Sequence, residues 1–473
     1  EVEAFRNLLA VNLLAGVFDC SVLFGDFGGV LQSDEYPGFG GIVNDLAKVD
    51  FSNGSMVYVG EEISYSEIVT YWKGKSMREA FVDQEVKGEQ LQKLLRKKYE
   101  LIQKHLQALV GERELFNFMK QFKQSHLFMR PDFEELEREF NARFHVNLRE
   151  ILNYYYEGKE LPALFIRDLK VELYEEDEET KNIGSCKIYN PTSVPAVVTL
   201  SVATYSMGDN ESGSGLRNYL IPGHSCKEIR ADLGMRDVFA LGMNLSQNLP
   251  GENVLEWTSS KDLSKTKDGK TGIWDVDSAI FTRKAPGIVV NAEDPGFVIH
   301  EKKRKGKLAA YFSKEKNERK YSYVYDHEHW TLTMDSHCYG DIVKSAYYKI
   351  AGTGKSKVEW KVNVENPGKY EVLVYVPDVE ATSARKVFIG GARLFYQVTS
   401  AGDVTDVEVL LDNEEPGWIS LGKYHFDRGE YSVFLSDRGG DSLTWENDGT
   451  YAWERDAVQL IFANAVKWIP VSE

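Results

Sequence analysis

The fold is decided by the stretch Val358-Glu-Trp-Lys-Val-Asn-Val-Glu-Asn-Pro-Gly-Lys-Tyr-Glu-Val-Leu-Val-Tyr-Val376. It contains two strand candidates, Val358–Val364 and Tyr370–Val376, with an Asn-Pro-Gly turn between them. Glycine and Asp/Asn turns divide the rest of 285–473 in the same way, and about eight short strands there predict a jelly-roll-like β-sandwich. The other strand candidates are Val387–Ile389, Val407–Leu411, Tyr431–Leu435 and Ala457–Phe462.

A second β region is predicted over residues 166–284. Apolar and polar residues alternate there, as in strands with one buried face, and turn clusters such as Asn190–Ser193 separate the runs. We expect strands in Asp232–Asn244 and Asn253–Trp257 and a solvated turn at the acidic run Glu175–Glu179. Together these segments predict a small antiparallel β-sandwich.

The first part of the chain is predicted to be mainly α-helical. Apolar residues between Leu91 and Val110 keep a helical period, and Gly111 ends this helix as a C′ glycine would. A second helix is expected over Glu112–Gln121. A third opens after Asp132 with acidic residues in its first turn, and a fourth carries the apolar stripe from Leu148 to Tyr155.

Length and composition fit this multidomain α+β organisation. The chain has 473 residues, and about 150 residues per domain predicts three domains, which we place at 1–165, 166–284 and 285–473. With 56 Lys and Arg against 73 Asp and Glu, the net charge of −17 argues against nucleic acid as a partner. No uninterrupted apolar run reaches about 18 residues, so we expect no membrane span in this chain.

The sequence contains no complete catalytic or cofactor motif. His-Glu-x-x-His and Gly-x-Ser-x-Gly are absent, and Gly352–Ser356 lacks the first glycine of a phosphate loop and is interpreted as a β-turn. His327 and His329 would share one face of a strand, so a two-His site is the alternative to a polar strand end. The acidic pair Asp34-Glu35 is interpreted as a turn rather than as an acid/base pair. We therefore expect no catalytic residue, no metal and no cofactor.

The four cysteines form no Cys-x-x-Cys pair, so neither a zinc ribbon nor a redox motif is predicted. Buried thiols are the expected state. A disulfide between Cys186 and Cys226 is the alternative if the compartment is oxidising.

Aromatic and acidic residues gather in the expected loop Ser436–Arg455, between two late strands. Sugar rings stack their C–H faces on flat aromatic rings, and their hydroxyl groups form hydrogen bonds with carboxylates and amides. The loop is therefore the predicted ligand-binding surface. The alternative is that one or two of its rings cap the core of the sandwich. The candidate residues are Trp445, Tyr451, Trp453, Asp437 and Asp441.

The C-terminal region, over about 290–468, resembles the golvesin or xanthan-lyase type domain, a β-sandwich module of bacterial exported proteins. The resemblance implies binding of carbohydrate or of a cell-surface component, without defined ligand residues. Most of the matching positions are Gly, Pro and aromatic residues that we expect to specify turns and core. They are Asn291 to Phe297, Trp330, Ala346-Tyr347-Tyr348, Gly352, Gly354, Val358, Trp360, Pro367 to Val372, Gly417-Trp418, Leu421-Gly422, Tyr424, Phe426, Gly429 and Asp456-Ala457-Val458.

Residues 91–165 are similar to the C-terminal helical part of the catalytic domain of gluzincin aminopeptidases, in which helices lead into a β-sandwich. The zinc-binding helix that would precede this part is absent from the chain, so no catalytic residue is carried over. The similar segments are Leu109 to Phe116, Asp132 to Leu136, Phe140 to Phe144 and Tyr155 to Leu164.

The sequence thus predicts a non-catalytic binding region that presents a module to a glycan or another envelope component. We expect an extracytoplasmic location, in the periplasm or at the cell surface, with a possible membrane anchor outside this chain, as in proteins of the Bacteroides group. The alternative is the C-terminal part of an aminopeptidase-like zinc protein whose catalytic motif lies upstream or is degenerate. A third reading is a purely structural spacer.

Overall fold

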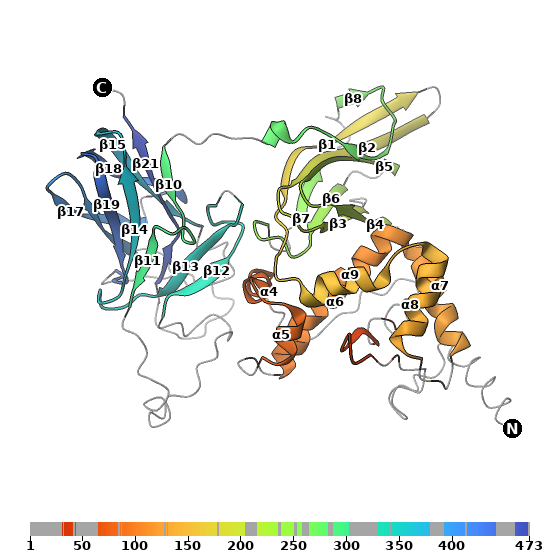
Figure 1. The fold of residues 1–473 in the computed structure, drawn as a ribbon. Coiled ribbons are helices and arrows are strands. Elements are labelled where there is room, and N and C mark those ends of the chain that lie inside the picture. Colours follow the sequence, from red (N-terminus) through yellow and green to blue (C-terminus); the bar gives the residue numbers. More distant parts are fainter. Residues whose placement is uncertain are drawn as a thin grey trace, which may run out of the picture.

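The computed structural model consists of helices followed by several β-sheets, as the sequence predicts (Figure 1). The helices lie at the lower right of Figure 1, the central sheets above them and the C-terminal sheets at the left. The structure describes residues 31, 33–40, 43, 65–83, 86, 88–126, 129, 131–176, 179–203, 215–234, 238–249, 253–257, 264–281, 287–301, 329–340, 342–378, 392–411, 414–440 and 459–471.

The four helices predicted after residue 90 are confirmed. Asp132 caps the N-terminus of α8, where its side chain accepts a hydrogen bond of 2.9 Å from the Glu135 backbone N–H. Gly111 separates two helices with a backbone φ of 88°, a conformation that favours glycine. The helices are α4 (Tyr65–Trp72), α5 (Met77–Phe81), α6 (Gly88–Val110), α7 (Glu112–Ser125), α8 (Phe133–Phe144) and α9 (Leu148–Glu157).

The short helices α4 and α5 were not predicted as separate elements. Ser76 forms a capping box with Glu79 at the start of α5, a local signal that the sequence does contain. Trp72 and Tyr71 at the end of α4 are almost fully buried in the helical core. The glycine- and aromatic-rich segment before α4 contributes Tyr36 to the same core, and the Tyr36 hydroxyl donates a hydrogen bond of 2.7 Å to Asn153.

A buried histidine in this core makes the stability of the protein depend on pH. His105 of α6 lies 2.8 Å from the Tyr155 hydroxyl of α9, and burial lowers the pKa of His105 to about 4. Between pH 6.5 and 4 the unfolded chain binds a proton at this position that the folded chain does not, so stability falls as the pH falls.

We expect His105→Gln to remove this contribution. From pH 7 to pH 5 the wild type should lose about 2 kcal/mol more unfolding free energy than the variant. Urea unfolding of both proteins at the two pH values measures the difference. Equal losses would contradict a buried neutral imidazole.

The central region contains two sheets that share one hydrophobic core, which confirms the predicted sandwich. One sheet has the order β8-β1-β2-β5-β9 and the other the order β4-β3-β6-β7. All strand pairs in them are antiparallel except β1 with β8. The strands are β1 (Phe165–Glu176), β2 (Glu179–Asn190), β3 (Ala196–Ala203), β4 (Gly215–Ile221), β5 (Ser225–Gly234), β6 (Val238–Met243), β7 (Asn253–Trp257), β8 (Ser264–Thr266) and β9 (Gly272–Asp275), followed by the 3₁₀ helix η1 (Ser278–Phe281).

The structure differs from the predicted strands at one segment of this region. The segment Asp232–Asn244, predicted as strand, contains the end of β5 and all of β6, which lie in different sheets.

The described cysteines are free thiols. Cys186 and Cys226 are buried on neighbouring strands, and burial raises the pKa of Cys186 to about 12. Cys338 is also free and buried.

The C-terminal region is a two-sheet sandwich around a second large core, with a small third sheet beside it. The sheets have the orders β10-β21-β15-β18, β11-β14-β19-β16-β17 and β12-β13-β20. The strands are β10 (Ile288–Val290), β11 (Phe297–His300), β12 (Thr331–Met334), β13 (Ser345–Ile350), β14 (Lys357–Val364), β15 (Gly368–Val376), β16 (Arg393–Thr399), β17 (Val404–Leu410), β18 (Gly417–Phe426), β19 (Gly429–Ser436), β20 (Leu460–Ala463) and β21 (Ala465–Pro470).

The quoted stretch 358–376 forms β14 and β15, one in each of the two packed sheets. Alternate residues of both strands point into the core, among them Trp360 and Val374, each 1% exposed. Of the other strand candidates, Val387–Ile389 and the first residues of Ala457–Phe462 lie outside the described residues.

The helices contact both β regions. Helix α6 packs against β3 and β4, and α4 packs against β12. The Ser66 hydroxyl of α4 donates a hydrogen bond of 3.1 Å to Asp335, and the Thr70 hydroxyl accepts one of 3.0 Å from the Met334 backbone. Within the part of the chain that the structure describes, no helix is long and apolar enough to cross a membrane.

Candidate functional site

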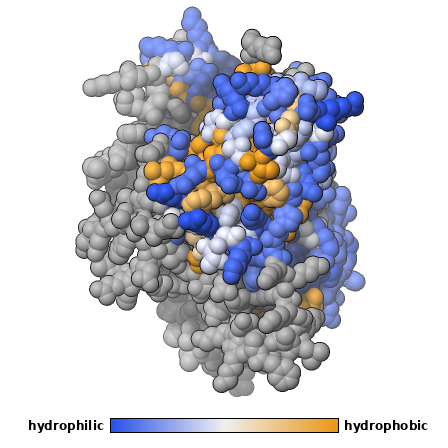
Figure 2. Space-filling view, turned by 90° about the vertical axis from the view of Figure 1, so that its left-hand side faces the viewer, coloured by the Kyte–Doolittle hydropathy of each residue, from blue (hydrophilic) through white to orange (hydrophobic). Residues whose placement is uncertain are grey.

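The outer face of the β10-β21-β15-β18 sheet carries the residues best suited to contact a ligand. Strand side chains alternate between the two faces of a sheet. In β15, Val372, Val374 and Val376 are buried in the sandwich, so Leu373 and Tyr375 point outward and are partly exposed. Figure 2 shows the molecule from the left-hand side of Figure 1, where the C-terminal sandwich lies, and apolar side chains gather there among hydrophilic ones.

Three aromatic residues form a compact group at one end of this face, which we call the aromatic cluster: Tyr339, Tyr375 and Trp418. The Tyr339 ring centroid lies 4.7 Å from that of Trp418 and 5.5 Å from that of Tyr375. The Tyr375 and Trp418 centroids are 5.4 Å apart, with an angle of 77° between the rings. All three side chains are partly exposed.

Secondary structure fixes the position of each ring. Tyr375 of β15 and Trp418 of β18 are directly opposite in the antiparallel register. Tyr339 precedes β13, and the buried side chain of Asn464 holds its backbone: Asn464 accepts a hydrogen bond of 2.7 Å from the Tyr339 N–H and donates one of 3.1 Å to its carbonyl. The cluster is therefore assembled before any ligand binds, which lowers the entropic cost of binding.

A lysine completes the cluster. The Lys467 ammonium of β21 lies 4.0 Å from the centroid of the Trp418 ring, a cation–π contact. Burial lowers the pKa of Lys467 and raises the pKa of Tyr375 relative to their ordinary values. The cluster thus combines apolar ring surface, phenol hydroxyls and an ammonium group within one small area.

Positive charge predominates along the outward positions of β15, β18 and β21. Three of these positions carry lysines, Lys369, Lys423 and Lys467, and one carries a carboxylate, Glu371. The Glu371 carboxylate accepts a hydrogen bond of 2.8 Å from the Ser420 hydroxyl. The whole chain, by contrast, has a net charge of −17. A locally basic face on an acidic protein favours an anionic ligand over a cationic one.

The sequence-predicted residue Asp437 lies elsewhere, inside the C-terminal region. Its carboxylate forms an ion pair of 2.9 Å with Lys349, and the two side chains are 5% and 7% exposed. It also accepts a hydrogen bond of 3.4 Å from the Ser356 N–H. Trp445, Tyr451, Trp453 and Asp441 lie outside the described residues.

The Lys349–Asp437 pair is the centre of a buried polar network. Lys349 also lies 3.4 Å from Glu301, which accepts a hydrogen bond of 3.3 Å from Ser356. The Trp330 indole N–H donates a hydrogen bond of 2.9 Å to the Ser356 hydroxyl. Gly352, from the segment interpreted as a β-turn, packs against the Asp437 carboxylate where a side chain would collide with it.

The structure also describes residues of the two other sites considered from the sequence, the two-His site and the acidic pair Asp34-Glu35. His329 lies 3.2 Å from Glu301, while His327 is outside the described residues. Glu35 forms an ion pair of 2.5 Å with Arg149, which lowers the pKa of Glu35. Among the described residues, one group could hold a metal ion: His126, Glu135 and Glu139.

The aromatic cluster was not predicted as a site. Trp418 was assigned to turn or core, but the structure corrects this, because Trp418 lies on the outer face and the next residue, Ile419, points inward. A half-exposed aromatic pair in register across two strands is a signal that becomes visible only when the strand pairing is known.

Comparison with known proteins identifies one part of the chain. No curated protein matches it. Among solved structures it is similar to a Paenibacillus xanthan lyase, with 13% identity and a TM-score of 0.25 over 67% of this chain and 26% of that one. It is also similar to an Arthrobacter globiformis T6 isomalto-dextranase complexed with panose, with 11% identity and a TM-score of 0.17 over 79% of this chain and 47% of that one. A Bacteroides uniformis β-glucuronidase is similar at 11% identity and a TM-score of 0.17, over 68% of this chain and 32% of that one. The chain therefore spans less than half the length of each. Residues 317–444, which include all three rings of the aromatic cluster, match the Golvesin C-terminal domain.

Proposed function

We propose that the C-terminal sandwich is a non-catalytic carbohydrate-binding module of a bacterial surface or envelope protein, and that it binds its glycan at the aromatic cluster. The observation that carries this proposal is the group of three partly exposed rings, with centroids 4.7–5.5 Å apart, beside Lys467. Aromatic rings supply the apolar surface that the C–H face of a sugar needs. The adjoining hydroxyl and ammonium groups supply hydrogen bonds for its oxygens.

The charges on the same face favour a glycan that carries carboxylate or sulfate groups. Lys369, Lys423 and Lys467 face outward from neighbouring strands, and the single carboxylate among them accepts a hydrogen bond from Ser420. Because lysine is a flexible point charge, it accommodates acidic groups at different positions along a polysaccharide. An acidic polysaccharide of the cell envelope would be such a ligand, and the extracytoplasmic location is part of the same proposal.

A glycan array probed with the whole chain tests the proposal. We expect binding to acidic glycans, such as uronic-acid polymers, in preference to neutral ones, and an affinity that falls as NaCl is raised from 50 to 500 mM, since salt screens exposed charges. Incubation of the bound glycans with the protein should release no shorter products. Absence of binding to every glycan on the array would contradict the proposal, and salt-independent binding to neutral glycans would contradict its acidic part.

The similarity of residues 91–165 to aminopeptidases stays a prediction, and the carbohydrate-binding proposal does not depend on it. The three domain boundaries also stay predictions, although α9 ends at Glu157 before β1 begins at Phe165, and η1 ends at Phe281 before β10 begins at Ile288.

A further inference from the structure

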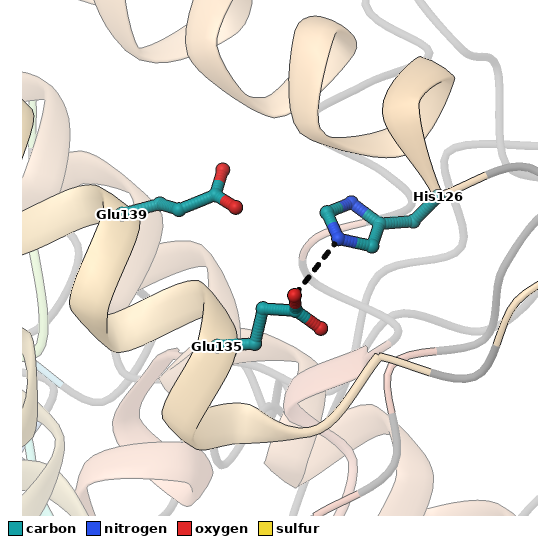
Figure 3. Close-up of side chains that lie close together, drawn as sticks. All are labelled: His126, Glu135 and Glu139. Atoms are coloured by element: carbon teal, nitrogen blue, oxygen red, sulfur yellow. Dashed lines mark ion pairs between the residues drawn. The ribbon is translucent and has the colours of Figure 1, made fainter.

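His126, Glu135 and Glu139 point toward one another between two helices of the N-terminal region (Figure 3). His126 is the C-cap residue of α7, and the two glutamates lie on α8. Residues four apart on a helix share a face, so both carboxylates of α8 are directed to the same side. One ligand atom from each of the three residues lies within 4.8 Å of the other two.

The orientation of the imidazole is fixed by a hydrogen bond on its other nitrogen. Nδ1 of His126 lies 2.8 Å from the backbone carbonyl oxygen of Phe122, which can only accept, and 3.0 Å from the Ser125 hydroxyl, which itself donates to that carbonyl. Nδ1 therefore carries a proton. The ring also packs on the Phe122 ring at a centroid distance of 4.3 Å. A histidine that donates its Nδ1–H to a backbone carbonyl presents its Nε2 lone pair, and this arrangement is typical of histidine ligands of metals.

The distance from His126 to Glu135 also fits two ligands of one ion. Nε2 lies 3.4 Å from the nearer carboxylate oxygen of Glu135. A charge-assisted hydrogen bond between them would be about 2.7–2.9 Å long. Two ligands bound at about 2.0–2.2 Å around a tetrahedral zinc ion lie about 3.4 Å apart.

The glutamates leave capacity for such an ion. Glu139 is partly buried and forms no hydrogen bond or ion pair with any residue that the structure describes. Among the described residues, the Glu135 carboxylate has one further partner, the exposed Arg138 at 3.5 Å. Without a cation, the Nε2 lone pair would face the negative carboxylates, and this arrangement is electrostatically unfavourable in a partly buried place.

We propose that His126, Glu135 and Glu139 bind a divalent transition-metal ion of the Zn²⁺ type. One imidazole and two carboxylates form a donor set that such ions accept, and three protein ligands leave at least one coordination position for water or a ligand. Glu139 also lines a groove of about 490 Å³ between α7 and α8, together with Phe118, Phe122 and Arg143. The proposed site therefore adjoins a groove at the surface of the helical region.

Zinc binding by the whole chain tests the proposal. After loading and dialysis, we expect one bound Zn²⁺ per chain by elemental analysis, and Co²⁺ should give visible d–d absorption typical of low coordination. Glu139→Gln, which keeps the shape of the side chain, and His126→Ala should each weaken zinc binding at least tenfold. Glu134→Gln is the matched control, because Glu134 is an exposed glutamate of the same helix outside the cluster.

Two results would overturn the proposal. One is wild-type protein that retains no zinc after dialysis, which would mean that a proton on Nε2 of His126, and not a metal ion, faces the two carboxylates. The other is equal zinc affinity of the wild type, Glu139→Gln and Glu134→Gln. Circular dichroism of each variant shows whether it is folded. If His126→Ala does not fold, the comparison of Glu139→Gln with the wild type still decides the test. Glycan binding by the C-terminal sandwich should be unaffected in all variants.

Discussion

Replacing Lys349 by Met is expected to lower the unfolding free energy of the C-terminal sandwich by about 3–5 kcal/mol. The ammonium group of Lys349 neutralises Asp437 at 2.9 Å in a place where both side chains are almost inaccessible to water. Without it, the Asp437 carboxylate stays buried, and the one hydrogen bond left to it among the described residues is that of 3.4 Å from the Ser356 backbone N–H. Hydrogen exchange of the slowest amides in β13, β14 and β19 measures the loss, because these amides report the unfolding of that sandwich.

A second variant separates the cost of an unpaired charge from the loss of the lysine side chain. Lys349→Met combined with Asp437→Leu removes both charges, and we expect it to recover most of the lost stability, since a buried ion pair can often be replaced by apolar groups. Glu408→Gln breaks the exposed pair with Arg393 in the same sandwich and should cost less than about 1 kcal/mol. Equal losses for Lys349→Met and Glu408→Gln would show that the buried network contributes no special stability.

Trp418→Ala is expected to weaken binding of an acidic oligosaccharide at least tenfold. Trp418 contacts both tyrosines of the aromatic cluster and lies under the Lys467 ammonium, so its removal destroys the apolar surface and frees the lysine. Central aromatic residues of binding sites commonly contribute about 2 kcal/mol or more. Isothermal titration calorimetry with an oligosaccharide found on the array measures the change.

Trp274→Ala is the matched control for this prediction. Trp274 of β9 is also partly exposed and also has a lysine over its ring, Lys270 at 5.7 Å, but it belongs to the central sheets. The affinity of Trp274→Ala should equal that of the wild type. If both tryptophan variants bound the oligosaccharide as tightly as the wild type, the aromatic cluster would not be the binding site.

The local signals of the sequence are sufficient for much of the fold. Helices α6 to α9 can be predicted from the helical period of their apolar residues, from the N-cap residue Asp132 and from Gly111, which has a positive φ. Each of these signals acts over a few residues. The strands β14 and β15 follow from their alternation and the turn between them. Asp232–Asn244 was predicted as one strand because periodicity alone does not show that a chain leaves one sheet and enters another.

The sites depend on long-range contacts that the sequence does not reveal. Asp437 was interpreted as a ligand residue because its partner Lys349 lies 88 positions away. The outward position of Trp418 depends on the register with β15, which shifts between Val372 and Leu373. Tyr339 reaches the cluster only because Asn464, 125 positions away, holds its backbone. His126 and Glu139 likewise meet only when α7 and α8 pack together.

The most direct test of the binding proposal is fluorine NMR of the protein labelled with 5-fluorotryptophan, titrated with an acidic oligosaccharide. The chain has 9 tryptophans, and single Trp→Phe variants assign the resonances of Trp418, Trp445 and Trp453. We predict that the Trp418 resonance shifts in proportion to the bound fraction. Saturating oligosaccharide that leaves Trp418 unchanged while shifting Trp445 or Trp453 would place the glycan in the 436–455 loop and contradict a site on the outer face of the β10-β21-β15-β18 sheet.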